Sequence, residues 1–408
     1  MRWRVLGLAL VCLGLAERSQ AQEFKVWNRA VQVHGFASQG FVYTDHNNWL
    51  SMNTNDGSGA MTDMGLNMSS QLTDRLRVGA QIYDRNVGRF GQWHPSLDWA
   101  VADYHFSNWL GIRGGKVKTT LGLYNDSQDL DFLHVFAFLP QSIYPTDLRD
   151  TTIAHTGGDV YGNVALGRRF GAVSYTAFAG IHHDSIYSGY PYLATQWSAY
   201  FRDIEGPQYG ADLRWETPWK NLLLGVSRMN QEITAKGFFQ NNAVAPQPVP
   251  YQTTTKAYWS NQYYGRLHGR RLEVDGEYRR YVILFPMFAG SNVSMDARGW
   301  YISGTYRVGK HFEAGSYYSR YTITTVSGGL AQFYLPSQTD TSLPQNHVYD
   351  KVVAGRWDLN RFVYLKIEGH FMDGYGLGPY PDGFYPQQNP AGFKSKTNAL
   401  VLKTGFHF

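Results

Sequence analysis

Long apolar runs are almost missing from this chain of 408 residues. The one exception, residues 5–16, is shorter than the roughly 20 apolar residues that a membrane-spanning helix needs. A bundle of such helices is therefore excluded. The sequence is not dominated by helix formers either, since 43 glycines and an aromatic content of 16% favour strands instead.

Cysteine is nearly absent, because the single Cys12 lies within the first 21 residues. This segment begins with Arg2 and Arg4, continues with the short apolar run, and ends in "SQA", the small-x-small pattern of an export signal. We predict that residues 1–21 are a secretory signal peptide. The remaining residues 22–408 contain no cysteine and are expected to form a single domain.

Charge is also scarce, since charged residues make up 17% of the chain and the formal net charge is +5. Removal of the predicted signal lowers this charge to +3, because the segment carries three arginines and one glutamate. So small and dispersed a charge predicts that nucleic acid is not a partner.

Apolar and polar residues alternate with period two in many segments, which is typical of strands with one apolar face. In residues 76–83, "LRVGAQIY", the apolar Leu76, Val78 and Ile82 share one face, and Arg77 and Gln81 lie on the other. In a membrane barrel only alternate residues face lipid, so this weak pattern is the expected one. It predicts sixteen strands, at residues 30–45, 61–72, 76–85, 96–106, 110–118, 158–166, 171–182, 207–216, 221–230, 253–267, 272–283, 297–308, 311–321, 346–359, 362–373 and 397–408.

The predicted connections alternate strictly between short and long. Seven short turns, such as residues 73–75 and 309–310, separate eight long loops, one after each odd-numbered strand. Short turns at one end and long loops at the other are typical of outer-membrane barrels. Closure is required there, because an open sheet in hydrocarbon would leave its edge N–H and C=O groups unpaired. We therefore predict an all-β fold, a 16-stranded antiparallel transmembrane β-barrel with long extracellular loops and short periplasmic turns.

Two other all-β folds were weighed. A β-propeller would also give many strands, and Trp357-Asp358 supplies one Trp-Asp pair, but no repeat near 40 residues is present. A soluble sandwich would pack its apolar faces together and has no reason to carry eight long loops on one rim. Both are less consistent with the sequence than a barrel.

The longest connection, residues 119–157, is unusually long for a structureless loop and is expected to be functional. It is also the third long loop. Sixteen strands, a terminal Phe and a long third loop resemble the general porins of Gram-negative bacteria. The segments "GGKVKTTLGLYND" (residues 114–126), "LPQSIYPTDLRD" (139–150) and "HGFASQGFVYT" (34–44) resemble a poorly characterised group of proteobacterial porins, distantly similar to phosphate-selective porins.

The resemblance implies an outer-membrane channel in which loop 119–157 folds into the lumen and narrows it. It also implies a homotrimer, with outer-membrane lipid, small hydrophilic solutes and the barrel-assembly machinery as partners, and no cofactor. Loop acids opposite wall bases would then set up a transverse field at the constriction. The candidate residues are Asp126, Asp129, Asp131, Asp147, Arg149 and Asp150 on the loop, and Arg77, Arg113, Lys116 and Lys118 on the wall.

Passive diffusion of small hydrophilic solutes is the function that we expect. Two alternatives stay open: a substrate-specific channel of the same fold, for anions, dicarboxylates or sugars, and an outer-membrane barrel hydrolase. A hydrolase would have to use His182, His183 and Asp184, or His155 with Ser142 and Asp150. Neither group has a nucleophile elbow or the spacing of metal ligands, so we expect no enzyme.

The last predicted strand carries Leu400, Leu402, Phe406 and Phe408 on one face, and Lys403 lies on the other. We expect the first face to contact lipid and the second to face the interior. A terminal Phe on such a strand resembles the signal read by barrel-insertion machinery, which makes Phe406 and Phe408 candidate assembly residues.

Overall fold

The computed structural model describes residues 22–26, 29–219, 221–243, 245–286, 291–333, 335–376 and 383–408. The predicted signal peptide, residues 1–21, lies outside this described part. The strands are β1 (Gln22–Val26), β2 (Arg29–Thr44), β3 (Ser58–Gln71), β4 (Leu76–Val87), β5 (Ser96–Ser107), β6 (Leu110–Lys118), β7 (Ala154–Gly167), β8 (Gly171–His183), β9 (Ala199–Glu216), β10 (Leu222–Asn241), β11 (Ala245–His268), β12 (Leu272–Pro286), β13 (Asn292–Arg307), β14 (Phe312–Gly328), β15 (His347–Asp358), β16 (Val363–Gly374) and β17 (Lys396–His407).

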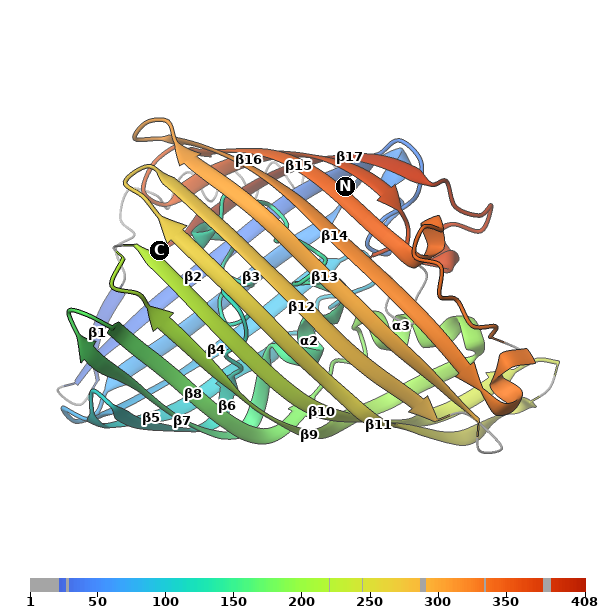
Figure 1. The fold of residues 1–408 in the computed structure, drawn as a ribbon, viewed down its shortest axis with the longest axis horizontal. Helices are drawn as coiled ribbons and strands as arrows, with labels where there is room; N and C mark the ends of the chain where they lie inside the picture. The colour runs from blue at the N-terminus through green and yellow to red at the C-terminus, as the bar shows by residue number, and fades with distance from the viewer. Residues whose placement is uncertain are drawn as a thin grey trace.

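Strands β2 to β17 form one closed antiparallel ring (Figure 1). Each strand pairs with the next one in the sequence, and β17 closes the ring by pairing with β2, for example through Val401 and Val42. Phe408, the residue after β17, and Gly35 on β2 also exchange two backbone hydrogen bonds of 3.0 and 3.3 Å. The predicted sixteen-stranded barrel is therefore confirmed. The short β1 forms a hairpin with the start of β2.

The alternating pattern is realised as an apolar exterior and a polar interior. On β17, Leu400 and Leu402 are 39% and 43% exposed on the outside, whereas Val401 is fully buried. Lys403, on the inner face, is buried among polar partners. Side chains of successive strand residues point to opposite faces, so every strand contributes to both surfaces.

Two predicted long loops are wrong, because β10 and β11, and likewise β12 and β13, run further than the apolar alternation indicated. β10 ends at Asn241 and β11 begins at Ala245, which leaves residues 242–244 between them. The predicted connection between residues 283 and 297 is shortened in the same way by β12 and β13. The outward residues Glu232, Thr234 and Lys236 in the extension of β10 are polar, so the sequence resembles a loop although the backbone pairing continues.

Helices are few and short. They are η1 (Thr54–Asp56), η2 (Asp131–Leu133), η3 (Thr146–Leu148), α2 (Arg149–Thr152), α3 (Gly189–Ala194), η4 (Thr195–Trp197), η6 (Gly329–Phe333), η7 (Pro344–Asn346) and η8 (Pro386–Gln388). Among the described residues, none of the helices is long and apolar enough to cross a membrane. α2 lies inside the ring, together with the rest of the connection between β6 and β7 (Figure 1).

Candidate functional site

The connection between β6 and β7, residues 119–153, is here called the inner loop. It is shorter than the predicted loop 119–157, because β7 already begins at Ala154. Its apolar segment "FLHVFAFLP" packs against the inside of the ring: Phe138 meets Trp49 edge-on at 5.2 Å and Phe136 meets Tyr317 at 4.9 Å between ring centroids. Burial of these aromatic side chains is the main force that holds a loop of this length inside.

Close backbone approach fixes the inner loop against β12 and β13. Residue 299 on β13 has to be glycine, because the Cβ of any other residue would lie 2.0 Å from the backbone oxygen of Ser142. Next to it, Arg279 donates to the carbonyl oxygen of Ile143 at 3.0 Å. Glu277 on β12 accepts hydrogen bonds from the Tyr144 hydroxyl at 2.7 Å and from the Leu123 N–H at 3.0 Å.

A second set of contacts fixes the inner loop to β15 and β16. The carboxylate of Glu368 accepts from the backbone N–H groups of Ala137 and Phe138, at 2.7 and 3.3 Å. Arg356 donates to the carbonyl oxygens of Phe132 and His134, at 2.6 and 3.0 Å. These bonds satisfy backbone groups of a segment that has no regular secondary structure of its own, which a buried loop requires.

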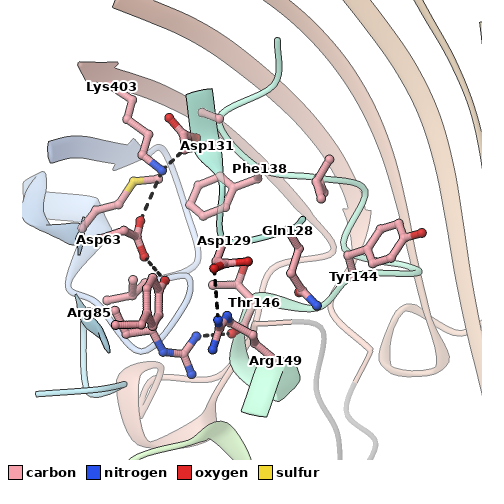
Figure 2. A pocket seen from close by; sticks show the side chains of 15 residues that line it. Asp63, Arg85, Gln128, Asp129, Asp131, Phe138, Tyr144, Thr146, Arg149 and Lys403 are labelled. Carbon is pink, nitrogen blue, oxygen red and sulfur yellow. Dashed lines mark hydrogen bonds and ion pairs between the residues drawn. The ribbon is translucent and has the colours of Figure 1, made fainter. Parts of the chain in front are cut away.

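Asp131 is the centre of the charge contacts on this side (Figure 2). Its carboxylate accepts from Lys403 at 3.1 Å, the contact drawn in Figure 2. It also accepts from Lys366 at 2.9 Å and from the Tyr364 hydroxyl at 2.6 Å. Burial alone would raise the pKa of Asp131, but the two ammonium groups outweigh it and hold the pKa well below its ordinary range. Lys403 also reaches Asp63 at 3.3 Å, so it links the loop to β3.

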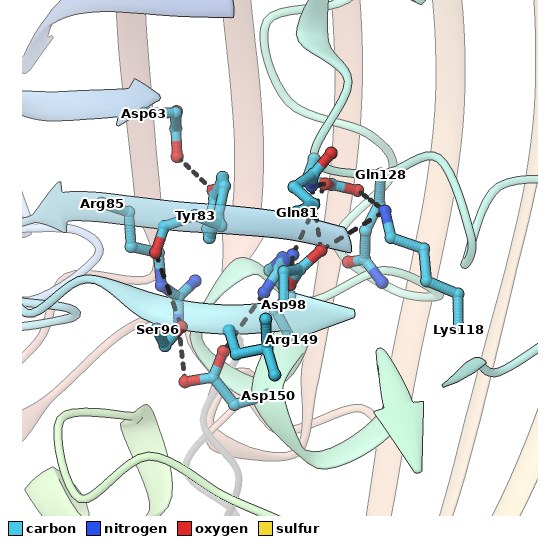
Figure 3. Close-up of polar contacts among 12 residues, drawn as sticks. Asp63, Gln81, Tyr83, Arg85, Ser96, Asp98, Lys118, Gln128, Arg149 and Asp150 are labelled. Atoms are coloured by element: carbon cyan, nitrogen blue, oxygen red, sulfur yellow. Dashed lines mark hydrogen bonds and ion pairs between the residues drawn. The ribbon is translucent and has the colours of Figure 1, made fainter. Parts of the chain in front are cut away.

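A third set of contacts joins the inner loop to β4, β5 and β6 through alternating acids and bases (Figure 3). Asp129 pairs with Lys118 at 2.5 Å and with Arg149 at 3.7 Å. Arg149 pairs in turn with Asp98 at 2.6 Å and with Asp150 at 3.5 Å. Burial raises the pKa of Asp129, but Lys118 and Arg149 outweigh this effect and lower it. Asp129 therefore remains ionised at neutral pH.

The predicted site residues fall into three groups. Lys118, Asp129, Arg149 and Asp150 are brought together in the network of Figure 3, and Asp131 belongs to the neighbouring cluster of Figure 2. Asp147 is buried elsewhere and accepts a 2.5 Å hydrogen bond from Tyr385. Burial raises the pKa of Asp147 from 3.8 to about 6.

The remaining predicted residues lie apart from these clusters. Arg77 donates to Ser69, Arg113 pairs with Asp159 on β7 at 2.8 Å, and Lys116 donates to the Leu97 carbonyl. Asp126 is half-buried, and its carbonyl oxygen accepts from Lys118. Where loop acids and wall bases do meet, they are in direct contact. Such pairs neutralise each other, which weakens the case for a transverse field across an open gap.

Several contributors were not singled out from the sequence as loop contacts. Lys366, Glu277 and Glu368 are recognisable as inward-facing from strand alternation, but nothing in their local sequence indicates that they bind the inner loop. Arg85 was overlooked, although its position three residues after the outward Ile82 indicates the inner face. It donates to the carbonyl oxygen of Thr146 at 2.8 Å.

Two hollows flank the inner loop. One, of about 60 Å³, lies between the loop and β3–β4 and is lined by Asp63, Arg85, Gln128 and Lys403 among others (Figure 2). The other, of about 690 Å³, lies between the apolar segment of the loop, the short turn after β11 and the short-turn end of β13, and Arg270 and Arg307 are among its lining residues. The first has room for only on the order of four water molecules.

Neither a protein-family model nor a curated protein matches this sequence. Solved structures do match in fold. OmpT, an outer membrane protein of Vibrio cholerae, is similar with a TM-score of 0.59 at 12% identity, over 95% of this chain and 100% of that chain. An anion-selective porin from Comamonas acidovorans is similar with a TM-score of 0.54 at 10% identity, over 93% and 100%. The outer membrane channel DcaP of Acinetobacter baumannii is similar with a TM-score of 0.53 at 11% identity, over 95% and 99%. The likeness is one of fold, a closed antiparallel barrel.

Proposed function

We propose that this protein is a porin of a Gram-negative outer membrane, through which small hydrophilic solutes diffuse passively. The observation that carries the proposal is the closed sixteen-stranded ring, which has an apolar exterior and a charged interior. A ring of this size is too wide for strand side chains alone to fill. Closure pairs the backbone N–H and C=O groups that an open sheet would leave free at its two edges, and a sheet that spans hydrocarbon requires this pairing.

The exterior supports a membrane location. Large apolar side chains are exposed around the ring, for example Ile82 at 56%, Ile302 at 55% and Phe371 at 52%. Contiguous exposed apolar surface of this extent is unfavourable in water and favourable in a bilayer.

The inner loop is proposed as the constriction of the channel. It contacts the wall on three sides, and the small hollow beside Gln128 is the place where a passage would be narrowest. A second candidate is a channel of the same fold that is specific for a substrate class.

Assembly as a homotrimer is part of the proposal. OmpT of Vibrio cholerae, similar in fold, has also been solved in a trimer form. Outer-membrane lipid and the barrel-assembly machinery would be the other partners.

A channel is proposed rather than an enzyme. His182 was a candidate for catalysis, but its side chain is fully buried. Its two ring nitrogens lie 2.8 Å from Asp184 and 2.8 Å from the carbonyl oxygen of Glu232. The other candidates, His155 and Ser142, have different partners, Thr119 and the Trp300 carbonyl. A buried imidazole with both nitrogens engaged cannot reach a substrate.

Liposome swelling tests the proposal and separates the two channel candidates. Liposomes that contain the purified protein should swell in solutions of small sugars and amino acids, at rates that fall smoothly as solute size increases. Swelling restricted to one solute class would support the specific channel instead. Liposomes that do not swell, with hydrolysis of lipid or peptide substrates by the same preparation, would contradict both.

A further inference from the structure

On one side of the barrel, basic residues line the edge of the apolar exterior that is nearest to the long loops. On β10, the outward Leu224 and Val226 are each 39% exposed, and the next outward residue toward the long-loop end is Arg228. The same order occurs on β13, where Trp300 is followed by Arg298, and on β15, where Val353 is followed by Lys351. This set is here called the outer basic belt; its members are Arg228, Arg280, Arg298, Arg320 and Lys351.

Strand register places the belt on adjacent positions. Arg228 pairs with Asn261 on β11, Asn261 pairs with Arg280 on β12, and Arg280 pairs with Arg298 on β13. Directly opposed residues of antiparallel strands lie about 5 Å apart, so Arg280 and Arg298 are neighbours, and Arg228 lies one strand further on, beyond Asn261. On β14 and β15 the row is staggered toward the short-turn end, because Arg320 is opposite Trp300 and Lys351 is opposite Tyr318.

Local acids do not neutralise this row. Arg280 and Arg298 share one carboxylate, that of Asp296, at 2.7 and 3.2 Å, and their side chains remain 42% and 54% exposed. Arg228 donates to the neutral amides of Asn261 and Asn230, at 2.9 and 3.1 Å. Among the described residues, Asp296 is therefore the one carboxylate that pairs directly with any of the four arginines of the belt, and Asp373 on β16 lies diagonal to Lys351. Like charges on directly opposed residues repel one another, so an external anion would be favourable beside Arg280 and Arg298.

Aromatic rings hold the guanidinium groups at the edge of the apolar band. Arg228 and Arg280 both lie against the ring of Trp259, at 5.5 and 5.7 Å from its centroid, and Arg320 lies 4.1 Å from that of Tyr349. Tryptophan and tyrosine in barrels gather at the level of lipid headgroups. Long basic side chains with their stems on apolar surface place the charge at that same level.

The belt occupies an arc rather than the whole circumference. On the strands that flank it, the residues that follow the apolar band are not basic: Pro207 and then Glu205 follow Tyr209 on β9, and Asp373 follows Phe371 on β16. A general requirement for charge at the membrane surface would not produce this asymmetry. The arc is therefore a surface for a ligand with several negative charges.

We propose that the outer basic belt binds phosphate groups of lipid headgroups in the leaflet on the long-loop side. This inference rests on the proposed outer-membrane location. Guanidinium groups in a row match phosphate oxygens through paired hydrogen bonds, and a headgroup with two phosphates would span neighbouring arginines. The acyl chains of the same lipid would lie on the apolar residues directly below.

Lipid retention on the full-length protein tests the proposal. The protein, reconstituted in nanodiscs with a bis-phosphorylated glycolipid and a neutral lipid, would be extracted with mild detergent, and the retained phosphorylated lipid measured by native mass spectrometry. The variant carries Arg228→Gln, Arg280→Gln and Arg320→Gln. Each basic residue near an anionic surface contributes about a factor of five, so retention should fall about a hundredfold.

Three controls make the result interpretable. Arg89→Gln, Lys394→Gln and Lys396→Gln remove the same charge at the long-loop end outside the arc, and this variant should retain lipid as the original protein does. Replacing the three belt arginines by Lys keeps the positive charge but removes the paired hydrogen bonds, so retention should lie between that of the glutamine variant and that of the original protein. Inorganic phosphate should not displace the lipid. Displacement would instead identify the belt as a site for free anions.

Equal lipid retention by the glutamine variant and the original protein would overturn the proposal. Bilayer conductance of the same preparations separates this failure from failure of the proposed function. Conductance should be unchanged in the glutamine variant, because the belt lies outside the barrel. Lipid binding without any conductance would leave the belt assignment intact and contradict the porin.

Discussion

Replacing Asp131 by Asn should release the inner loop from β16 and β17. The change keeps the size of the side chain but removes the charge that two lysines share. Lys366 and Lys403 are only 3% and 6% exposed, and they lie 2.9 and 3.1 Å from the carboxylate. Removing one partner of a buried ion pair destabilises a protein by about 3–5 kcal/mol, because the remaining charge is left uncompensated.

That free energy corresponds to a shift in the docking equilibrium of the inner loop by a factor of roughly a hundred to a few thousand. Single-channel recording in planar bilayers would measure the effect. Relative to the original protein, Asp131→Asn should show larger and noisier conductance, with frequent transitions between levels. A matched control is Asp203→Asn, which removes a carboxylate from the exposed pair with Lys236 on the outside. This control should leave the recordings unchanged.

The pH dependence of this contact follows from the lowered pKa of Asp131. A carboxyl group with a lowered pKa contributes stability above its ordinary pKa, and this stability is lost only as pH falls through the lowered value. Titration of Asp131 should therefore cause no change in the conductance of the original protein between neutral and mildly acidic pH. An Asp131→Asn variant with the conductance and noise of the original protein would refute the reasoning.

Three further predictions concern other parts of the structure. Gly299→Ala would place a Cβ 2.0 Å from a backbone oxygen of the inner loop, and it should lower the free energy of unfolding, measured by thermal unfolding, by about 1–3 kcal/mol. Gly304→Ala on the same strand places its Cβ where nothing lies within 4 Å and should have no effect. Equal effects of the two substitutions would argue against the position of the loop. Burial raises the pKa of Asp147 from 3.8 to about 6, so the folded state binds more protons between these values, and stability should fall by about 2–3 kcal/mol as pH rises through this window. Asp147→Asn should abolish that dependence in unfolding experiments, and an unchanged pH profile would exclude this residue as the cause. Phe408→Ala should lower the amount of folded barrel in the membrane, measured by surface labelling, without altering the conductance of the molecules that do assemble; normal surface levels would remove Phe408 as an assembly residue.

Much of the barrel could be predicted from the sequence, because lipid outside and water inside impose a period of two on every strand. This rule located all sixteen strands, and it placed Lys403 inside and Leu402 outside on the last one. It failed where the outer face is polar. Arg228 and the outward residues after it on β10 interrupt the apolar alternation, so the predicted strand stops at residue 230, whereas backbone pairing continues to Asn241.

The contacts of the inner loop could not be predicted to the same depth. The sequence indicated an unusually long connection rich in aspartate, and Lys118 and Asp129 were both proposed as functional. Their direct pairing depends on the path of the loop, which is set by distant residues such as Glu368 and Gly299. No local pattern encodes contacts between residues more than a hundred positions apart. Their geometry became apparent only from the folded chain.

The central claim, that the inner loop narrows a conducting passage, can be tested by placing one thiol in it. Residues 22–408 contain no cysteine, so Gln128→Cys would provide a single reactive group beside the small hollow. Single-channel conductance would be recorded before and after addition of a bulky, water-soluble thiol reagent, with labelling confirmed by mass. If the inner loop narrows the passage, labelled channels should lose conductance in steps. Fully labelled channels with unchanged conductance would contradict it.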